Sequence, residues 1–364
     1  MATRNARSSR SLAHASVTAL APDPHDASAS ADGVDVLSDV LQAVRLSGAL
    51  FFLTDASSPW SVAVPRSTAL TSILHPRAQH LISYHVVTSG SCWCHCASAP
   101  ALFLNEGDVV VIPHGDEYQL SQPAGHHSQW TAHEVLGFFR DMARRDHPFV
   151  VTEGGGGPGG VKVLCGFLGC DVRPFNPVFG ALPPLLHVPR VPRAPGTKGD
   201  PLSHLIDFTM QESRVRDAGT ECVIVRLAEL MFVEVVRRYL ASVPPGQTGW
   251  LAGLRDPVIG EALGLLHRAP ERDWTLPRLA REVNQSRSVL AERFTHVVGS
   301  PPMQYLTRWR MQLAARLLAD GSQKVAAIAA AVGYESEAAF SRAFRRATGV
   351  PPATWRRNTR GGGN

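Results

Sequence analysis

The sequence lacks any apolar run long enough to cross a bilayer, so we expect no association with a membrane. It also lacks the apolar segment of a secretory signal peptide. Only 6 of its 364 residues are cysteine, and no two of them form a Cys-x-x-Cys pair. Because nothing directs export, secretory disulfides are not expected, and we predict a cytoplasmic protein.

Charge is unevenly distributed along the chain. Residues 268–360 hold 16 Arg or Lys and 7 Asp or Glu, a net charge of +9, whereas the whole chain carries +5. The remaining residues therefore sum to −4. A basic C-terminal region suits a polyanionic partner, although a solvated basic surface is the simpler explanation when no motif accompanies it.

The C-terminal region contains one pattern twice. In the second copy, aliphatic residues recur at helical spacing over 325–332, and Gly333 ends this predicted helix. Ser336 then suits the N-cap of another helix, whose inner face carries Phe340 and Phe344. Two short helices joined by a tight turn predict a helix-turn-helix.

The first copy has the same parts. A predicted helix over 275–284 and a turn at Gln285-Ser286 precede Leu290 and Phe294, which take the places of the two phenylalanines. Both copies end in Gly-x-Pro-Pro, and an amphipathic helix over 303–318 would hold them rigidly apart. This tandem arrangement is far more specific than a single helix-turn-helix pattern.

These segments resemble the AraC/XylS family of bacterial transcription regulators. The matching residues include Trp274–Ala280, Ala291–Phe294, Pro302–Met311 and Ile328–Phe344, and the resemblance covers nearly all of 255–357. It implies two recognition helices that enter successive major-groove segments on one face of double-stranded DNA. RNA polymerase is a further expected partner if the protein is an activator.

The non-apolar positions in the first turns of both recognition helices should face the groove. The predicted DNA-binding residues are Arg287, Ser288, Ala291, Glu292, Arg293, Glu337, Ala338, Ser341, Arg342, Arg345 and Arg346. Arg342 is the strongest candidate for reading a base, since a guanidinium can bridge guanine O6 and N7. The other arginines are expected on phosphates, and for every arginine a surface ion pair is the alternative.

The N-terminal half is predicted to contain short elements. A helix is expected over 34–49, and another over 132–145. Strands are expected at 49–54, 61–64, 83–87, 91–96, 101–104, 109–112 and 161–167, and many short strands predict a barrel or sandwich. Asn105–Gly115, with 81–93 and 164–167, resembles the cupin-type sensor domain of one branch of the same family.

Two segments are interpreted as connections. The glycine-rich stretch 154–160 joins strands and is not a phosphate-binding loop, because no Gly-Lys-Ser/Thr follows it. The proline-rich stretch 183–201 is a predicted linker that leads into helices over 202–211 and 221–241. The second helix is apolar on all sides, so it must pack on the barrel or on another protomer. We favour the seam of a homodimer.

The cysteines allow three interpretations. Cys92, Cys94 and Cys96 alternate on a predicted strand, so their thiols should share one sheet face. Cys165 and Cys170 lie on or just after another strand. Packing is the main expectation, because free cysteine is among the most commonly buried residue types. Redox sensing and metal binding are the alternatives.

The histidines raise the alternative of a metal-dependent cupin enzyme. Available in this half are His80, His85, His114, His126 and His127. Enzymatic cupins carry a His-x-His with an acidic cluster and a later histidine, whereas this chain has Tyr118 near that last position and no His-x-His in the first box. We therefore expect no metal, no cofactor and no catalytic residue. The hypothesis that remains is a small-molecule effector inside the barrel, lined by His85, Trp93, Tyr118 and Cys165.

Together these observations predict a multidomain α+β transcription regulator rather than an enzyme. The expected parts are a disordered tail (1–33), a cupin-like β-barrel sensor domain (34–190), a Pro-rich linker with a helical dimerisation element (191–250), an all-α tandem helix-turn-helix domain (251–357) and a second disordered tail (358–364). An effector, or thiol oxidation, would change how the two DNA-binding domains of a dimer meet their half-sites. The alternatives are a cupin enzyme fused to a DNA-binding domain and a nucleoid-type binder without sequence preference.

Overall fold

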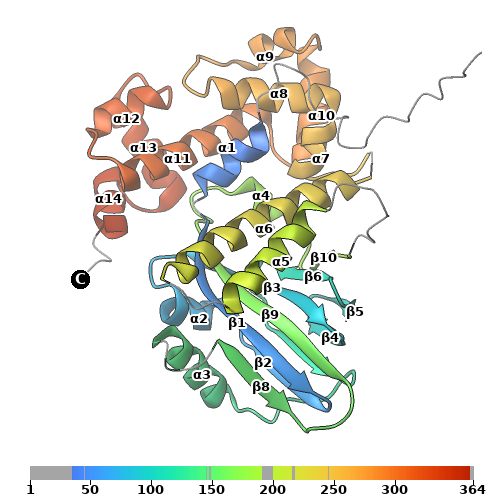
Figure 1. The fold of residues 1–364 in the computed structure, drawn as a ribbon. Coiled ribbons are helices and arrows are strands. Elements are labelled where there is room, and N and C mark those ends of the chain that lie inside the picture. Colours follow the sequence, from blue (N-terminus) through green and yellow to red (C-terminus); the bar gives the residue numbers. More distant parts are fainter. Residues whose placement is uncertain are drawn as a thin grey trace, which may run out of the picture. The chain divides into compact units, whose positions relative to one another are not determined.

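The structure is a computed structural model that describes residues 35–44, 46–144, 146, 149–190, 200–214, 218–244 and 246–360. The predicted tail 1–33, the last residues of the predicted tail 358–364, and residues 191–199 of the predicted linker lie outside the described residues. The described chain is rich in strands in its first half and helical in its second (Figure 1).

The strand-rich half contains two sheets and four helices among the described residues. The strands are β1 (Ser47–Ser57), β2 (Trp60–Val64), β3 (His80–Ser89), β4 (Ser91–Cys96), β5 (Ala99–Asn105), β6 (Val109–Ile112), β7 (Tyr118–Gln122), β8 (Val150–Gly154), β9 (Gly160–Cys170) and β10 (Leu186–Val188). The helices are α1 (Val36–Ala43), α2 (Ser67–Leu74), α3 (Ala132–Arg144) and α4 (Pro177–Ala181).

The two sheets share one apolar core. The six-stranded sheet has the order β10-β6-β3-β9-β1-β8, and the four-stranded sheet has the order β2-β7-β4-β5. Paired strands are antiparallel, except that β1 and β8 run parallel. Phe52 of β1, Cys94 of β4 and Leu120 of β7 belong to the same buried cluster. Burial of these alternating side chains between the sheets therefore stabilises this half of the chain.

In strand β4, buried and half-buried side chains alternate, as expected when successive side chains point to opposite faces of a sheet. Cys92, Cys94 and Cys96 are buried, whereas Trp93 and His95 between them are only half-buried. The prediction that the three thiols share one face is therefore confirmed. The same alternation sends Trp93 to the opposite face of the sheet.

Helices α5 (Pro201–Arg214) and α6 (Thr220–Ser242) pack side by side, and α6 lies against the six-stranded sheet (Figure 1). Leu227, Met231 and Val235 are buried on its inner side. The approach to β1 is so close that a Cβ on Gly48 would lie 2.8 Å from a methyl carbon of Val225. The apolar character of α6 therefore reflects packing on the sheet, which corrects our preference for a dimer seam along this face.

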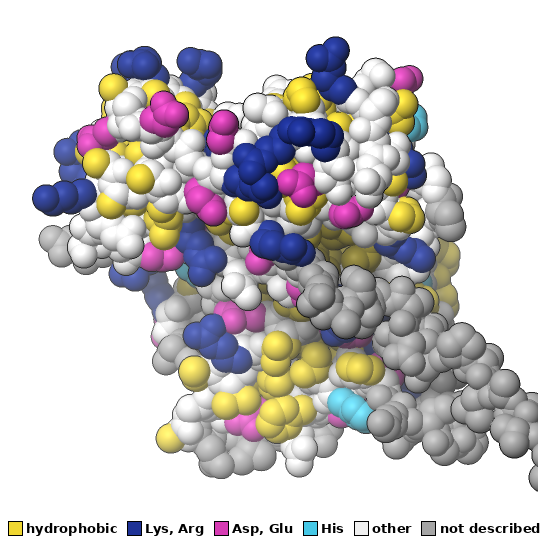
Figure 2. Space-filling view, turned by 90° about the horizontal axis from the view of Figure 1, so that it is seen from above, with side chains coloured by type: hydrophobic (Ala, Val, Ile, Leu, Met, Phe, Trp, Pro, Cys, Tyr) yellow, Lys and Arg dark blue, Asp and Glu magenta, His cyan; other side chains and the backbone are white. Residues whose placement is uncertain are grey.

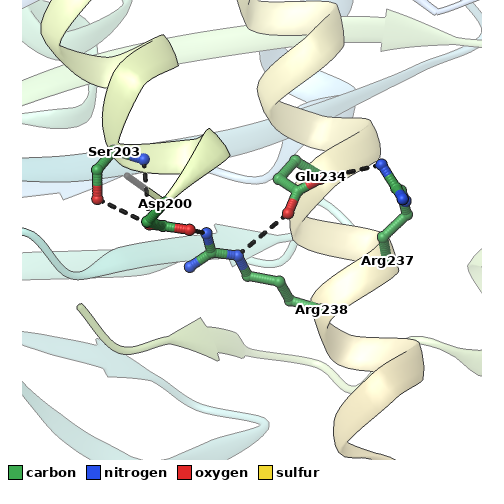
Figure 3. A network of polar contacts seen from close by, with 5 residues as sticks. All are labelled: Asp200, Ser203, Glu234, Arg237 and Arg238. Atoms are coloured by element: carbon green, nitrogen blue, oxygen red, sulfur yellow. Dashed lines mark hydrogen bonds and ion pairs between the residues drawn. The ribbon is translucent and has the colours of Figure 1, made fainter. Parts of the chain in front are cut away.

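A network of charged side chains joins the start of α5 to α6 (Figure 3). Asp200 accepts hydrogen bonds from the Ser203 backbone N–H at 3.2 Å and from the Ser203 hydroxyl at 2.7 Å, so it caps α5. Arg238 of α6 pairs with Asp200 and donates from Nε to Glu234 at 3.3 Å. Arg237 reaches the same Glu234 at 3.4 Å from a more exposed position. The network fixes the point at which the chain returns to the described fold after the linker.

The second half contains helices joined by short turns. They are α7 (Trp250–Arg255), α8 (Pro257–Arg268), α9 (Leu276–Glu282), α10 (Arg287–Val298), α11 (Pro302–Asp320), α12 (Val325–Ala331), α13 (Glu337–Thr348) and α14 (Pro352–Arg360). Within the described ranges, no helix combines the length and apolar character that a membrane span requires.

The structure corrects the sequence-based elements in several places. The helix expected over 34–49 ends at Ala43, because the chain enters β1 at Ser47. Helix α2 and strands β7, β8 and β10 were not predicted. Strand β10 lies inside the predicted linker 183–201, and there Leu186 and Val188 are buried where the strand pairs with β6. These elements are short, so their stability comes from partners distant in sequence rather than from a local pattern.

Candidate nucleic-acid interface and effector cavity

The two predicted helix-turn-helix units are present, and their second helices begin and end alike. The Ser286 hydroxyl caps α10 by accepting from the Val289 N–H at 3.3 Å, and the Ser336 hydroxyl caps α13 by accepting from the Ala339 N–H at 3.2 Å. Both helices end at a glycine in the left-handed region, with φ of 80° at position 299 and 83° at position 349. The local sequence thus sets both boundaries of each helix.

The two turns share a hydrogen-bond pattern but differ in length. Gln285 N–H donates to Ala280 O at 2.8 Å in the first unit, and Tyr334 N–H donates to Ala329 O at 2.9 Å in the second. A positive φ follows α9 at Asn284 (52°) and follows α12 at Gly333 (78°). Helix α12 begins 49 positions after α9, whereas α13 begins 50 positions after α10. The turn before Ser336 is therefore one residue longer than the turn before Ser286.

Each unit buries its inner face against the connecting helix α11. Leu290 and Phe294 of the first unit are fully buried, and Phe294 lies 5.9 Å from the ring centroid of Tyr305 on α11. Phe340 and Phe344 of the second unit are also fully buried, in a cluster that includes α11 residues such as Met311, Ala315 and Leu318. One continuous helix therefore supplies core residues to both units.

The predicted DNA-binding residues lie on the uncovered sides of α10 and α13. Arg287, Ser288, Glu292, Arg293, Glu337, Ala338, Arg342, Arg345 and Arg346 are exposed, and Ala291 and Ser341 are half-buried. Arg342 has no ion-pair or hydrogen-bond partner within the part of the chain that the structure describes. Lys and Arg side chains spread over the face seen from above, with acidic side chains between them (Figure 2). These positions are accessible to a large ligand.

Arg293 is engaged within the protein. Its guanidinium contacts the Asp256 carboxylate at 2.8 Å and 3.2 Å, which joins α10 to the N-cap of α8. Burial alone would raise the pKa of Asp256, but the N–H groups of Ile259 and Val258 together with Arg293 outweigh it and hold that pKa below its usual value. Arg293 thus forms the ion pair that was the alternative to a phosphate contact. A DNA phosphate would have to compete with the Asp256 carboxylate for this guanidinium.

Arg310 braces the two units in a way that the sequence analysis missed. Its half-buried guanidinium donates to Pro270 O at 2.7 Å, to Arg272 O at 2.8 Å and to Gly333 O at 3.3 Å. The first two carbonyls precede α9, and the third lies in the turn of the second unit. A Cβ at Gly333 would lie 2.7 Å from the Arg310 Nη2, so glycine at this turn leaves room for the brace.

We predict that Arg310→Met lowers the free energy of unfolding by about 1–3 kcal/mol, because it leaves three partly buried carbonyls without a charged donor. The aliphatic part of the side chain and the helix are retained. Urea unfolding monitored by circular dichroism measures the change. Arg316→Met on the same helix removes an exposed pair with Asp320 and should cost less than about 0.5 kcal/mol. Equal losses in the two variants would contradict the bracing role.

Helix α11 also contacts the strand-rich half. The fully buried Gln312 amide donates from Nε2 to Ala43 O at 3.0 Å and accepts at Oε1 from the Phe175 N–H at 3.0 Å. The Phe175 ring lies 5.5 Å from the Tyr305 ring, and Arg308 covers it at 4.4 Å. A single side chain therefore links α11 to two backbone groups of the other half.

A predominantly apolar cavity lies within the strand-rich half. Its walls are Phe52, Thr54, Trp60, Val62, Ala63, Val64, His85, Leu120, Ser128, Trp130, Val135, Phe138, Phe139, Val151, Glu153, Val163, Cys165 and Phe167. These residues come from both sheets, from α3 and from the segment before α3. The free volume is about 40 Å³.

Three of the four predicted effector residues lie at or next to this cavity. His85 and Cys165 line it, and His85 Nε2 lies 2.6 Å from the Tyr118 hydroxyl. The Cys165 thiol lies 3.6 Å from the Thr54 hydroxyl. Trp93 is not part of the lining, since its ring packs against Phe103, with the centroids 5.1 Å apart, on the other face of the four-stranded sheet. Trp60, Trp130 and the phenylalanines of α3 were missed, because their proximity depends on the fold.

Burial controls the ionisation of these groups. Burial lowers the pKa of His85 to about 3, so the imidazole is neutral near pH 7. Burial raises the pKa of Cys165 and of Cys92 to about 12, and that of Cys94 to about 12 with further contributions from Cys92 and Cys96. These thiols are therefore protonated at neutral pH.

The other predicted histidines are largely engaged or peripheral. His80 Nε2 lies 2.7 Å from Pro113 O, and His114 Nε2 lies 3.0 Å from Leu182 O. His126 is half-buried and His127 is exposed in the segment after β7. Among the described residues, no three His, Cys, Asp or Glu side chains lie together as metal ligands.

We predict that acidification destabilises the fold through His85. An unfolded histidine titrates near pH 6.5, so the stability that the neutral imidazole contributes is fully present above that pH and is lost as the pH falls toward 3. Between pH 7.5 and pH 5 the loss is about 2 kcal/mol. Unfolding of the wild type and His85→Gln at both pH values measures it, and the variant should lose about 2 kcal/mol less. His127→Gln should behave as the wild type, and an unchanged pH slope in His85→Gln would contradict this assignment.

Comparisons with known proteins match two separate parts of the chain. A cupin family model matches residues 35–241, and a helix-turn-helix domain model matches residues 279–358. A putative AraC-like transcription regulator of Streptomyces lividans is 44% identical over 177 residues, which are 49% of this chain and 57% of the relative. A protein of the same description from Streptomyces antibioticus is 42% identical over 181 residues, again 49% and 57% of the two chains.

A third relative matches almost end to end. The HTH-type transcriptional regulator AlkR of Acinetobacter baylyi is 26% identical over 334 residues, which are 90% of this chain and 100% of the relative. The matches to the two Streptomyces proteins, in contrast, span little more than half of those proteins.

A strand-rich domain followed by two capped recognition helices on one connecting helix defines a class of DNA-binding proteins. Within that class, the chain belongs to the AraC-type helix-turn-helix transcription regulators that carry an N-terminal cupin domain. The family predicted from the tandem repeat is confirmed.

Proposed function

We propose that this protein regulates transcription by binding specific double-stranded DNA through α10 and α13, and that a small molecule in the cupin cavity controls this binding. The arrangement of two exposed recognition helices on one braced helix carries the DNA-binding part of the proposal. Recognition helices of this kind place the first turns of the helix in the major groove. The net charge of +9 over residues 268–360 favours a polyanion.

We predict that Arg342→Ala weakens binding to the specific site by about 1–3 kcal/mol and relaxes the preference at one base pair. A guanidinium on the exposed first turns of α13 is able to read a guanine edge, and alanine removes that contact. The site is first selected from random duplexes, and affinities for the selected and random duplexes are then measured at one salt concentration.

Arg346→Ala, on the same helix, provides the control for a phosphate contact. It should weaken binding to selected and random duplexes equally. If Arg342→Ala shows the same equal loss, Arg342 contacts phosphate instead. If no sequence is enriched from the random pool, a nucleoid-type binder without sequence preference replaces the proposal.

The effector-binding part rests on the cavity of the cupin domain. It is lined by both sheets, and cupin-type β domains commonly hold ligands between their walls. We infer that a ligand is a better signal than thiol oxidation, because thiolates are the reactive species and the high pKa of Cys165 keeps its thiol protonated. The same consideration applies to Cys92 and Cys94.

A metal-dependent enzyme is the competing function for the cupin domain. No three His, Cys, Asp or Glu side chains of the described residues are grouped as metal ligands, which favours the sensor over the enzyme. Elemental analysis of the purified protein separates the two functions. Stoichiometric iron, nickel or manganese would favour the enzyme, and its absence at equilibrium with added metal would favour the sensor.

We propose that the cavity communicates with the DNA-binding domain through Gln312. Its acceptor, Ala43 O, ends α1, which leads directly into the cavity-lining strand β1. Its donor, the Phe175 N–H, follows β9, which supplies Cys165 and Phe167 to the cavity. Displacement of either strand by a ligand would therefore change a hydrogen bond to the helix that carries both recognition units.

We predict that Gln312→Leu accelerates amide hydrogen exchange at Phe175 by about 10–100-fold. The substitution removes the acceptor of a buried N–H, and such a loss is worth about 1–3 kcal/mol. Exchange followed by mass spectrometry measures the effect. Gln304→Leu, at an exposed position of the same helix, should leave exchange at Phe175 unchanged. Unchanged exchange in Gln312→Leu would argue against this contact as the route.

We also propose that the protein acts as a homodimer. Because the inner face of α6 is covered by the sheet, the dimer surface is expected on the outer sides of α5 and α6, where Phe208 is 47% and Leu230 is 53% exposed. RNA polymerase is the proposed partner if the bound sites activate transcription.

A further inference from the structure

The chemistry of the cavity walls indicates which ligand the cupin domain accepts, an inference that rests on the proposed effector function. Most of the lining is aliphatic or aromatic, and none of the described lining residues is Arg or Lys. An anionic ligand would therefore lose its hydration without gaining a cationic partner. Glu153, half-buried in the same lining, would disfavour it further.

Two buried nitrogen atoms of the lining have no hydrogen-bond partner among the described residues. They are Nδ1 of His85, whose side chain is 2% exposed, and Nε1 of Trp60, which is 3% exposed. Two further polar residues of the lining, Thr54 and Cys165, form a hydrogen bond with each other. Unpaired buried polar groups are costly and rare, and they often mark a place where a ligand or water completes the hydrogen bonding.

The two nitrogens limit which polar group the ligand can carry. The Trp60 N–H can only donate, so its partner must be an acceptor. His85 Nδ1 donates or accepts according to its tautomer, and a carbonyl or hydroxyl oxygen suits a donor. An ammonium group only donates hydrogen bonds, so it cannot pair with the Trp60 N–H. It would also exchange its hydration shell for an aromatic cavity in which Glu153 is the lone carboxylate among the described lining residues.

The free volume of the cavity limits the size of a ligand that can enter without movement of a side chain. The free volume of about 40 Å³ is well below the roughly 150 Å³ that holds benzene in a protein core. Trp130 is 39% exposed and meets Phe138 edge to face at 5.7 Å. Phe138 also meets Phe52 at 5.6 Å and Phe139 at 5.3 Å, so Trp130, on the exposed side of the lining, is the side chain whose displacement would enlarge the cavity.

We infer that the cavity binds an uncharged, mainly apolar molecule of about one ring, with one oxygen that accepts hydrogen bonds from Trp60 and His85. A neutral aromatic ketone has these properties. Displacement of Trp130 admits the ring, and the oxygen completes the hydrogen bonding of the cavity wall.

Four probes of similar shape test this assignment on the full-length protein. They are acetophenone (neutral, with an acceptor), ethylbenzene (neutral, without one), benzoate (anionic) and 1-phenylethylamine (cationic at pH 7). Ligand-observed NMR relaxation gives their Kd values in the absence of DNA. Acetophenone should bind about 3–10-fold more tightly than ethylbenzene, as expected for a net hydrogen bond, and at least 100-fold more tightly than either ion.

Variants locate the binding in the cavity. Trp60→Phe removes the N–H and keeps an aromatic ring, so it should bring the acetophenone to ethylbenzene ratio toward 1 while ethylbenzene binding persists. Persistent ethylbenzene binding shows that the variant is folded. Trp93→Phe, outside the cavity, should leave both Kd values unchanged. The assignment is overturned if an ion binds as tightly as acetophenone, if no probe binds, or if Trp60→Phe leaves the ratio unaltered.

The ligand class and the regulatory role can fail separately. If acetophenone binds with the expected selectivity but leaves affinity for the selected duplex unchanged, the ligand class stands and control of DNA binding by this cavity is wrong. If a charged molecule alters DNA affinity through this cavity, regulation stands and the ligand class is wrong.

Discussion

The geometry of the DNA-binding domain depends on the hydrogen bonds that Arg310 makes from the middle of α11. Two of its acceptors, Pro270 O and Arg272 O, precede the first helix-turn-helix. The third, Gly333 O, lies in the turn of the second helix-turn-helix. Apolar packing attaches each unit to α11, but packing alone is non-directional. A guanidinium presents its donors in a rigid fork, so these three hydrogen bonds add a directional constraint between the two units.

The same helix brings the two halves of the chain into contact. Gln312 lies two residues after Arg310 and bonds backbone groups that continue into β1 and β9. Those strands carry Phe52, Thr54 and Cys165 of the cavity. In the proposed mechanism, α11 is therefore both the spacer that DNA recognition requires and the element that receives a change in the cupin domain. These two roles require a helix that is buried on more than one side. Trp309 and Met311 are two residues apart and therefore point to nearly opposite sides of α11, and both are only 1% exposed.

Most of the C-terminal domain could be predicted from the sequence because its signals are local. Ser286 and Ser336 cap helices, the glycines at 299 and 349 end them, and aliphatic periodicity marks their inner faces. What depends on distant partners was missed, including strand β10 and the acceptors of Arg310. For α6 the sequence left two alternatives, the sheet or another protomer, and could not decide between them. Trp93 was expected in the cavity lining, although its alternation with three cysteines on one face of the strand already placed it on the opposite face. The cavity wall could be predicted only in part: His85 and Cys165 were expected there, whereas Trp60 and Trp130 come together with them only in the folded domain.

The proposed DNA recognition requires that the two recognition helices held by α11 engage adjacent major-groove segments together. Hydroxyl-radical footprinting combined with purine-methylation interference, on a duplex selected by the wild-type protein, tests it most directly. We predict two groups of protected positions on one face of the duplex, about one helical turn of 10 base pairs apart. Methylation at guanine N7 should interfere with binding in both groups. A single protected segment, or two segments whose separation varies among selected sites, would contradict it.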